Sequence, residues 1–386
     1  MVHSSLNSAF VMPDMLRPVR DMDPYRPCWC GSGGKYKFCH FRRERQQPVS
    51  AFDATKAMLE RRKRGRCSYP ASAGTACGHA VTEAHTVQRR GALAAIAEEG
   101  HVLDYKPASI NAMIEHGGRP PPRRVGVRRA STFPGFCNEH DAMFRPIESK
   151  TTVFDKQAAL LFAFRAVALE RYMKEVELAA VPAQREMDKG FPFEKQAAVQ
   201  QFLHVREIGV RQGLAYVEAW KSAFDTRVRS GDASDVHFLA VNFDRILPVA
   251  ACGAFCPEFD MRGAALQRLG RGVDALEHVT MNVAVFERQT SAVFAWLGKE
   301  GGPTAAFVKS FADLAEDRMA DAVVRVAFEN MENVYARPSW WDGLDPAARA
   351  KLMDAVWNIA GSHKPDCLVD RGTSYAAAGV VGVTSA

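Results

Sequence analysis

The chain has 386 residues, of which 47% are hydrophobic and 24% are charged, as in globular proteins large enough for two or three compact units. No apolar run reaches the roughly 18 residues of a membrane-spanning helix, and residues 1–20 lack a secretory pattern, so we expect a cytoplasmic protein with no membrane contact. Residues 1–150 hold 24 Lys and Arg against 14 Asp and Glu, whereas the remainder holds 26 against 30, so the front of the chain is basic.

The front of the chain is predicted to hold only short elements. Residues 1–24 show no periodicity and are expected to form a flexible lead-in, and a compact Cys/Gly/Lys segment follows at 25–45. The pattern beyond it predicts a helix over 51–64, a helix over 87–99, a strand over 100–106, a proline-rich loop over 117–124 and a strand over 125–130.

From about residue 152 the segments become longer and more regular. Apolar spacing predicts amphipathic helices over 160–180 and Glu194–Arg229, then strands over 236–243 and 245–255 and a hairpin over 278–297 that turns near Glu287–Thr290. Helices are predicted over Pro303–Glu332 and Pro346–Ile359, and the tail 371–386 is expected to be frayed or weakly structured.

Together these elements predict an α+β fold, in which small N-terminal zinc modules precede a larger mixed helical and antiparallel-sheet domain. The expected units are a lead-in (1–24), a first zinc module (25–45), a basic second zinc module (51–150), the α+β domain (151–370) and a tail (371–386).

Cysteine usage indicates metal binding. Six of the nine cysteines lie within the first 137 residues, in segments that also contain histidine. In a reducing compartment such clusters favour metal ligation over disulfides. Cys252 and Cys256 lie in apolar sequence instead, and we expect them to be buried thiols.

The first cluster consists of Cys28, Cys30, Cys39 and His40. Two thiolates one residue apart, followed after a glycine-rich turn by an adjacent thiolate and imidazole, supply the four ligands of a closed tetrahedral zinc site. A segment this short has too small a core to fold without the metal.

The segment from Cys28 to His40 resembles the SEC-C motif, a zinc-binding module written roughly C-x-C-G-S-G-x-K-Y/F-K-x-C-C/H, and fills each of its fixed positions. The resemblance covers about fourteen residues and implies structural zinc without catalysis. In the tail of the bacterial preprotein translocase ATPase, the related module contacts a chaperone and ribosomes.

The second cluster is formed by more distant residues. Cys67 and Cys77 supply a wide first pair and Cys137 with His140 a closer second pair, which together make a second Cys3His zinc site. His79 could replace Cys67 or Cys77 as a ligand, and the spacing does not decide between them.

This order of ligands resembles the treble-clef zinc fold and, in particular, HNH-type nucleases, in which a structural zinc supports a ββα core. The resemblance implies that His85 is the general base, acting with a catalytic metal. The sequence departs from that pattern in two places. A predicted helix follows His85, and Asp141 and Phe144 stand where such nucleases place further histidines, with Glu148 as a candidate replacement. The competing interpretation of His85 is a core or helix-capping histidine.

Arginines surround the second cluster in three stretches, at 61–66, 89–90 and 119–129. Because guanidinium groups bind phosphate in a bidentate manner, these stretches favour nucleic acid as a partner. They could equally form a solvated face, or a docking surface for the acidic C-terminal domain.

Two functional hypotheses follow. The first is a zinc protein whose basic front binds nucleic acid, and which is a divergent HNH-like nuclease. The second is a non-catalytic adapter, in which the zinc modules bind a protein partner. The sequence gives no indication of the oligomeric state.

Overall fold

The computed structural model describes residues 15–70, 77–149, 154–269, 276–358 and 364–386. At its centre is an eight-stranded antiparallel sheet with the strand order β10-β5-β8-β7-β6-β9-β2-β3. Its strands are β2 (His101–Asp104), β3 (Arg123–Gly126), β5 (His237–Phe243), β6 (Val249–Phe255), β7 (Val279–Phe286), β8 (Gln289–Trp296), β9 (Val334–Ala336) and β10 (Val380–Ser385). The segment 51–150 thus contributes two strands to the same sheet as the C-terminal part of the chain.

Both faces of the sheet are covered over its central strands, which explains why β5, β6, β7 and β8 are buried almost throughout, whereas the edge strands β3 and β10 are largely exposed. In β5, Leu239 and Val241 face the C-terminal helices, whereas Phe238 and Ala240 face the opposite layer. The helices on the first face are α9 (Pro303–Ala312), α10 (Glu316–Asn330), α11 (Pro338–Gly343) and α12 (Pro346–Asn358).

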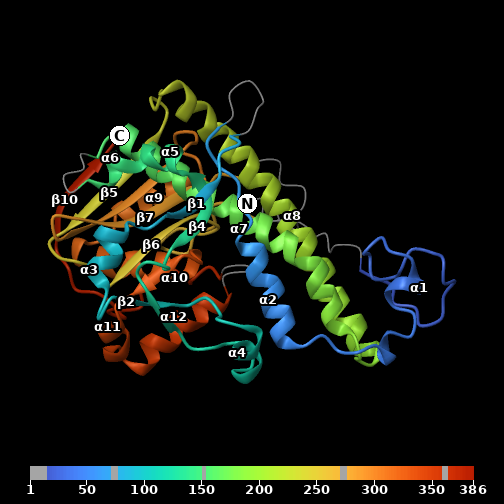
Figure 1. The fold of residues 1–386 in the computed structure, drawn as a ribbon. Coiled ribbons are helices and arrows are strands. Elements are labelled where there is room, and N and C mark those ends of the chain that lie inside the picture. The colour runs from blue at the N-terminus through green and yellow to red at the C-terminus, as the bar shows by residue number, and fades with distance from the viewer. Residues whose placement is uncertain (1–14, 71–76, 150–153, 270–275, 359–363) are drawn as a thin grey trace, which may run out of the picture.

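A long helical hairpin crosses the other face and extends beyond it (Figure 1). Its arms are α7 (Lys156–Arg185) and α8 (Phe193–Ser230), and η4 (Glu186–Asp188) lies at the tip. The Asp155 side chain caps α7 by accepting the Ala158 amide at 2.7 Å. At the other end, α8 stops at Gly231, whose φ of 72° is readily adopted by glycine. The hairpin therefore links the sheet to a module far from it.

The front of the chain supplies a second, two-stranded antiparallel sheet, β1 (Val81–His85) with β4 (Thr132–Cys137). Short helices surround these strands and the first cysteine cluster. They are α1 (Tyr36–Cys39), η1 (Arg43–Arg45), α2 (Ala51–Arg62), η2 (Arg89–Leu93), α3 (Ala94–Ile96), α4 (Ile110–Glu115), α5 (Asn138–Asp141), η3 (Ala142–Phe144) and α6 (Arg145–Glu148).

The α+β prediction is confirmed, and three local expectations are corrected. The helix expected over Pro303–Glu332 is broken at residues 313–315, and this break lets Phe307 of α9 and Val323 of α10 both be buried against the sheet. The tail is not frayed, because β10 pairs with β5 at the edge of the sheet. The strand expected over 125–130 ends at Gly126, where a turn begins.

Within the described ranges, no helix combines the length and hydrophobicity needed to cross a bilayer.

Candidate metal centres and the His85 cluster

The first cluster is assembled by a short loop and one helical turn. Gly31 and Gly33 adopt φ of 76° and 78°, which turns the chain between Cys30 and α1. The Cys28 amide donates to the Gly34 carbonyl oxygen at 2.8 Å and closes the loop. The four predicted ligand atoms, from Cys28, Cys30, Cys39 and His40, consequently lie within 4.8 Å of one another.

The separations fit a tetrahedral ion. Zinc bound about 2.3 Å from sulfur and 2.0 Å from nitrogen places two sulfurs roughly 3.8 Å apart, and sulfur and nitrogen roughly 3.5 Å apart. The Sγ atoms of Cys30 and Cys39 are 3.5 Å apart, and His40 Nδ1 lies 3.3 Å from Cys28 Sγ and 3.2 Å from Cys39 Sγ. A disulfide would require sulfurs about 2.05 Å apart, and all nine cysteines are free thiols.

The support for this cluster comes from the tip of the helical hairpin. His40 Nε2 lies 3.0 Å from Asp188 Oδ2, and the Asp188 carboxylate also accepts from Arg43 and Gln200. A carboxylate behind a ligating histidine fixes its tautomer and orientation. Burial opposes protonation of His40, but the bond to Asp188 and the neighbouring thiols outweigh it and raise the pKa of His40 to about 10.

Two buried arginines hold the backbone of the same cluster. Arg185 Nη1 donates to the Cys30 carbonyl oxygen at 2.9 Å, and Arg43 Nη1 donates to that of Cys39 at 2.9 Å. Trp29 packs edge-on against Phe193 at the start of α8, with ring centroids 5.7 Å apart. The module is therefore attached to the hairpin tip by ionic, polar and aromatic contacts.

The second cluster joins two loops to the end of the small sheet. Cys137 ends β4, and His140 lies in α5 directly after it, so the second pair stands at the first turn of a helix as expected. Cys137 Sγ is 3.9 Å from the Sγ atoms of Cys67 and Cys77 and 3.2 Å from His140 Nδ1. These four ligand atoms also lie within 4.8 Å of one another.

His79 is not one of these four grouped ligands, although its side chain also interacts with the Cys137 thiol. Its side chain is 66% exposed, and its Nδ1 lies 3.3 Å from Glu139 Oε2. The His140 ring instead stacks on Tyr69, with centroids 3.9 Å apart and planes 4° apart. Burial raises the pKa of Cys67 to about 11. Burial also opposes ionisation of Cys137, but hydrogen bonds from the His140 backbone and Cys67 outweigh it and lower its pKa to about 6.

His85 ends β1 and is half-buried. Its Nε2 donates to the Val127 carbonyl oxygen at 3.3 Å, which leaves Nδ1 as the basic nitrogen. Burial is the main reason that the pKa of His85 lies below its ordinary value, and Arg89 and Arg165 add to this effect. The imidazole is therefore neutral at neutral pH. The environment is neither sealed nor purely apolar.

The charge of Glu148, in the α5–α6 segment, acts on the same histidine, and Asp141 interacts in turn with Glu148. Glu148 accepts from the buried Arg165 at 2.8 Å, and Arg165 also donates to the His85 carbonyl oxygen at 3.4 Å. Burial raises the pKa of Asp141, and the charge of Glu148 raises it further. Sequence analysis singled out Asp141 and Glu148 but missed Arg165, because it lies inside a long helix with no motif around it.

A buried polar network holds the chain just beyond His85. Thr86 Oγ1 and Ser131 Oγ are 2.6 Å apart, and Asn333 donates to both. The Ser131 amide donates to Tyr335 Oη at 2.6 Å. His85 is thus fixed between the second metal cluster at one end of the small sheet and this network at the other.

The arginines of the front half divide into two groups. Arg66, Arg119, Arg123 and Arg124 make ion pairs with Glu175, Asp354, Asp104 and Glu99, respectively. By contrast, exposed arginines flank the His85 cluster and make no side-chain ion pair within the described residues; these are Arg89, Arg90, Arg128 and Arg129. Exposed arginines therefore lie beside His85, and others with no side-chain ion pair in the described part of the chain lie elsewhere in the front half, as at Arg26, Arg42 and Arg64.

The chain matches no protein-family model, and it shows no significant similarity to a curated protein or to a solved structure. The assignment of function accordingly depends on the geometry described above.

Proposed function

We propose that both clusters are structural zinc sites and that the first is a SEC-C-type module. Three thiolates and one imidazole form the donor set that zinc prefers in closed, non-catalytic sites. In each site the protein supplies all four donors, so bound zinc would cross-link the chain and would have no position left for a substrate.

The test is elemental analysis of freshly prepared full-length protein. We expect about two zinc ions per chain, reduced to about one by Cys39→Ser or by Cys77→Ser. A stoichiometry near zero, or iron in place of zinc, would contradict the proposal.

We further propose that the zinc-supported small sheet carries a nucleic-acid-cleaving centre. The observation that carries this proposal is a neutral half-buried imidazole, His85, that lies within electrostatic reach of the Glu148 carboxylate and beside exposed arginines. The arginines would bind the phosphate backbone, and His85 Nδ1 would take a proton from the attacking water.

Carboxylates such as Asp141 and Glu148 are of the ligand type that a hard divalent cation such as Mg²⁺ takes, and such a cation would stabilise charge on the phosphate. Arg165 is a positioning residue in this scheme, because it holds Glu148 and the backbone of His85.

Cleavage of labelled DNA and RNA by the full-length zinc-loaded protein in Mg²⁺ tests this centre. Replacing a general base costs about 10²–10⁴-fold in rate, so His85→Ala should remove cleavage while leaving two zinc ions bound. His101→Ala is the matched control, because His101 is exposed on β2 and its imidazole lies beside the Glu99 carbonyl oxygen rather than beside His85. The absence of salt-dependent nucleic-acid binding by the wild-type protein would exclude the proposal.

A second candidate function, protein-protein adaptation, is favoured by the surface of the first module. Phe38 is 78% exposed and Tyr25 62% exposed, and Lys37 lies over both rings, at 5.8 and 5.3 Å from their centroids. Exposed aromatic residues beside cations are typical of interaction surfaces. A pull-down in which Phe38→Ser removes a partner that wild type and Phe52→Ser both retain would support this function. Equal recovery by all three proteins would argue against it.

A further inference from the structure

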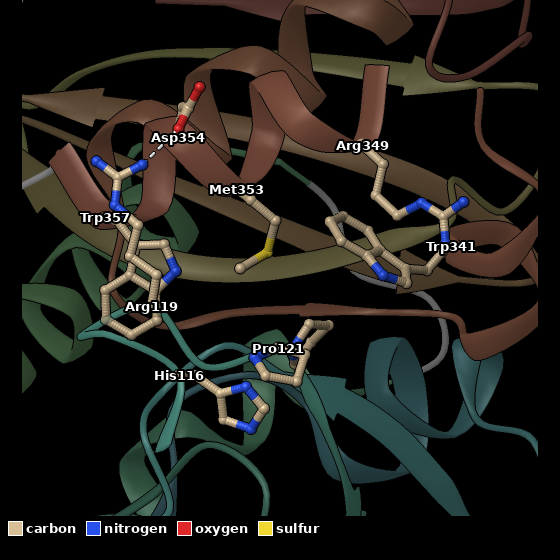
Figure 2. A pocket seen from close by; sticks show the side chains of 9 residues that line it. His116, Arg119, Pro121, Trp341, Arg349, Met353, Asp354 and Trp357 are labelled. Atoms are coloured by element: carbon tan, nitrogen blue, oxygen red, sulfur yellow. Dashed lines mark hydrogen bonds and ion pairs between the residues drawn. The ribbon is translucent and has the colours of Figure 1, made fainter. Parts of the chain in front are cut away.

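A cavity of about 450 Å³ lies between the front and the back of the chain (Figure 2). The loop between α4 and β3 forms one side, and α11 and α12 form the other. None of its lining residues belongs to either cysteine cluster, and neither functional proposal uses it. Its volume falls within the range of small-molecule sites, roughly 300–1,000 Å³.

Two tryptophans give the cavity aromatic walls. Trp341 and Trp357 lie on opposite sides, with the Met353 side chain between them (Figure 2). Trp341 is only 5% exposed and is held in place by Phe328, stacked at 6.2 Å, and by Tyr105, edge-on at 5.1 Å. One wall is therefore rigid, and a planar ring can pack against it with little loss of conformational freedom in the protein.

The charged side chains that line the cavity leave a net positive charge. Arg119 is paired with Asp354 at 2.7 Å, so the one carboxylate that lines the cavity is already neutralised. Arg349 also lines the cavity, and its guanidinium has no side-chain partner within the described ranges. One positive charge is thus left over beside an aromatic cavity.

Trp357 adds an unsatisfied donor. Its indole nitrogen is buried, yet it has no hydrogen-bond acceptor among the described residues. Buried donors are rarely left unpaired, so an unpaired donor in a cavity wall indicates that a ligand or water supplies the acceptor.

We propose that this cavity binds a planar aromatic molecule carrying an anionic group, of the class of nucleoside monophosphates. The base packs against Met353 and the tryptophan side chains on either side of it, and the Arg349 guanidinium binds the phosphate, a group that its planar fork matches. The inference is independent of the proposed nuclease centre, because it uses none of its residues.

Binding of AMP to the full-length protein, followed by tryptophan fluorescence and calorimetry, tests this site. We expect AMP to quench fluorescence and to bind about tenfold more tightly than adenosine, with inorganic phosphate binding more weakly than either. Arg349→Gln should reduce the affinity for AMP to that for adenosine, and Trp357→Leu should weaken both nucleoside ligands.

Lys351→Gln is the matched control, because Lys351 lies on the same helix but contacts Thr373 outside the cavity. It should leave the affinity for AMP unchanged. Failure of the wild-type protein to bind AMP or adenosine at millimolar concentration would overturn the proposal. So would an Arg349→Gln variant that melts like wild type and binds AMP equally well.

Discussion

The two Cys3His clusters have the same donor set but are supported in opposite ways. The first lies at the tip of the α7–α8 hairpin, where buried charged groups such as Asp188 and Arg43 surround it. The second belongs to the main core, since Cys137 is buried together with Phe133, Phe136 and the first half of α7. The comparison teaches that one ligand set can be stabilised by a local ionic shell or by an extended apolar core. The two arrangements should respond differently to damage.

The largest expected difference concerns loss of the metal itself. Cys137→Ser should remove one zinc ion and lower the main melting transition by at least about 5 °C, because metal binding at such sites contributes ~10–16 kcal/mol in isolated fingers. Cys39→Ser should also remove one zinc ion, yet leave that transition within about 2 °C. Calorimetry with zinc analysis measures both variants. Equal shifts in melting temperature would mean that the two clusters are not supported differently.

A smaller effect should appear where the hairpin meets the sheet. His278 is buried, stacks on Trp220 of α8 at 4.4 Å, and has its pKa lowered by burial to about 4. In the unfolded chain His278 has a pKa near 6.5. Its contribution to the free energy of unfolding is therefore fully present above about pH 6.5. About 3 kcal/mol of stability should be lost as the pH falls from 6.5 towards 4.

Denaturant unfolding of wild type and His278→Gln at several pH values measures this pH-dependent contribution to stability. The difference in stability between the two proteins should change with pH over this interval. Parallel pH profiles would show that His278 titrates alike in the folded and unfolded chain.

The smallest effect concerns the ionic shell of the first cluster. Asp188→Asn removes the negative charge that faces both His40 and Arg43. It should lower the zinc affinity of the first site about 10–100-fold and leave that of the second site unchanged. Competition with a chromophoric chelator measures the loss. Glu194→Gln is the control, because its ion pair with Arg20 is exposed and contributes at most about 1 kcal/mol. Equal effects of the two substitutions would show that Asp188 does not support the metal.

The sequence predicted those parts of the structure that depend on local pattern. The helices α7 and α8 were found within about five residues because their apolar spacing is regular. The ligands of the first cluster were found because they all lie within the thirteen residues from Cys28 to His40. The nature of the bound ion and the SEC-C resemblance remain predictions.

Features that depend on distant pairing could not be predicted. Asp188 follows a helix 148 residues beyond His40, and nothing around it marks a residue that supports a metal. The tail has small residues and no strong alternation, so its strand depends on the free edge of β5 rather than on its own propensity. The walls of the cavity likewise come from segments that only the folded sheet brings together.

The order of strands in the central sheet constrains how the chain can fold. Leu103 of β2 pairs with Ala336 of β9, so most of the polypeptide must be synthesised before this ladder can form. Such long loop closures slow folding. Until β9 has been synthesised, β2 and β3 cannot pair with the rest of the sheet. Their exposed edges and side chains could then mispair or be bound by chaperones.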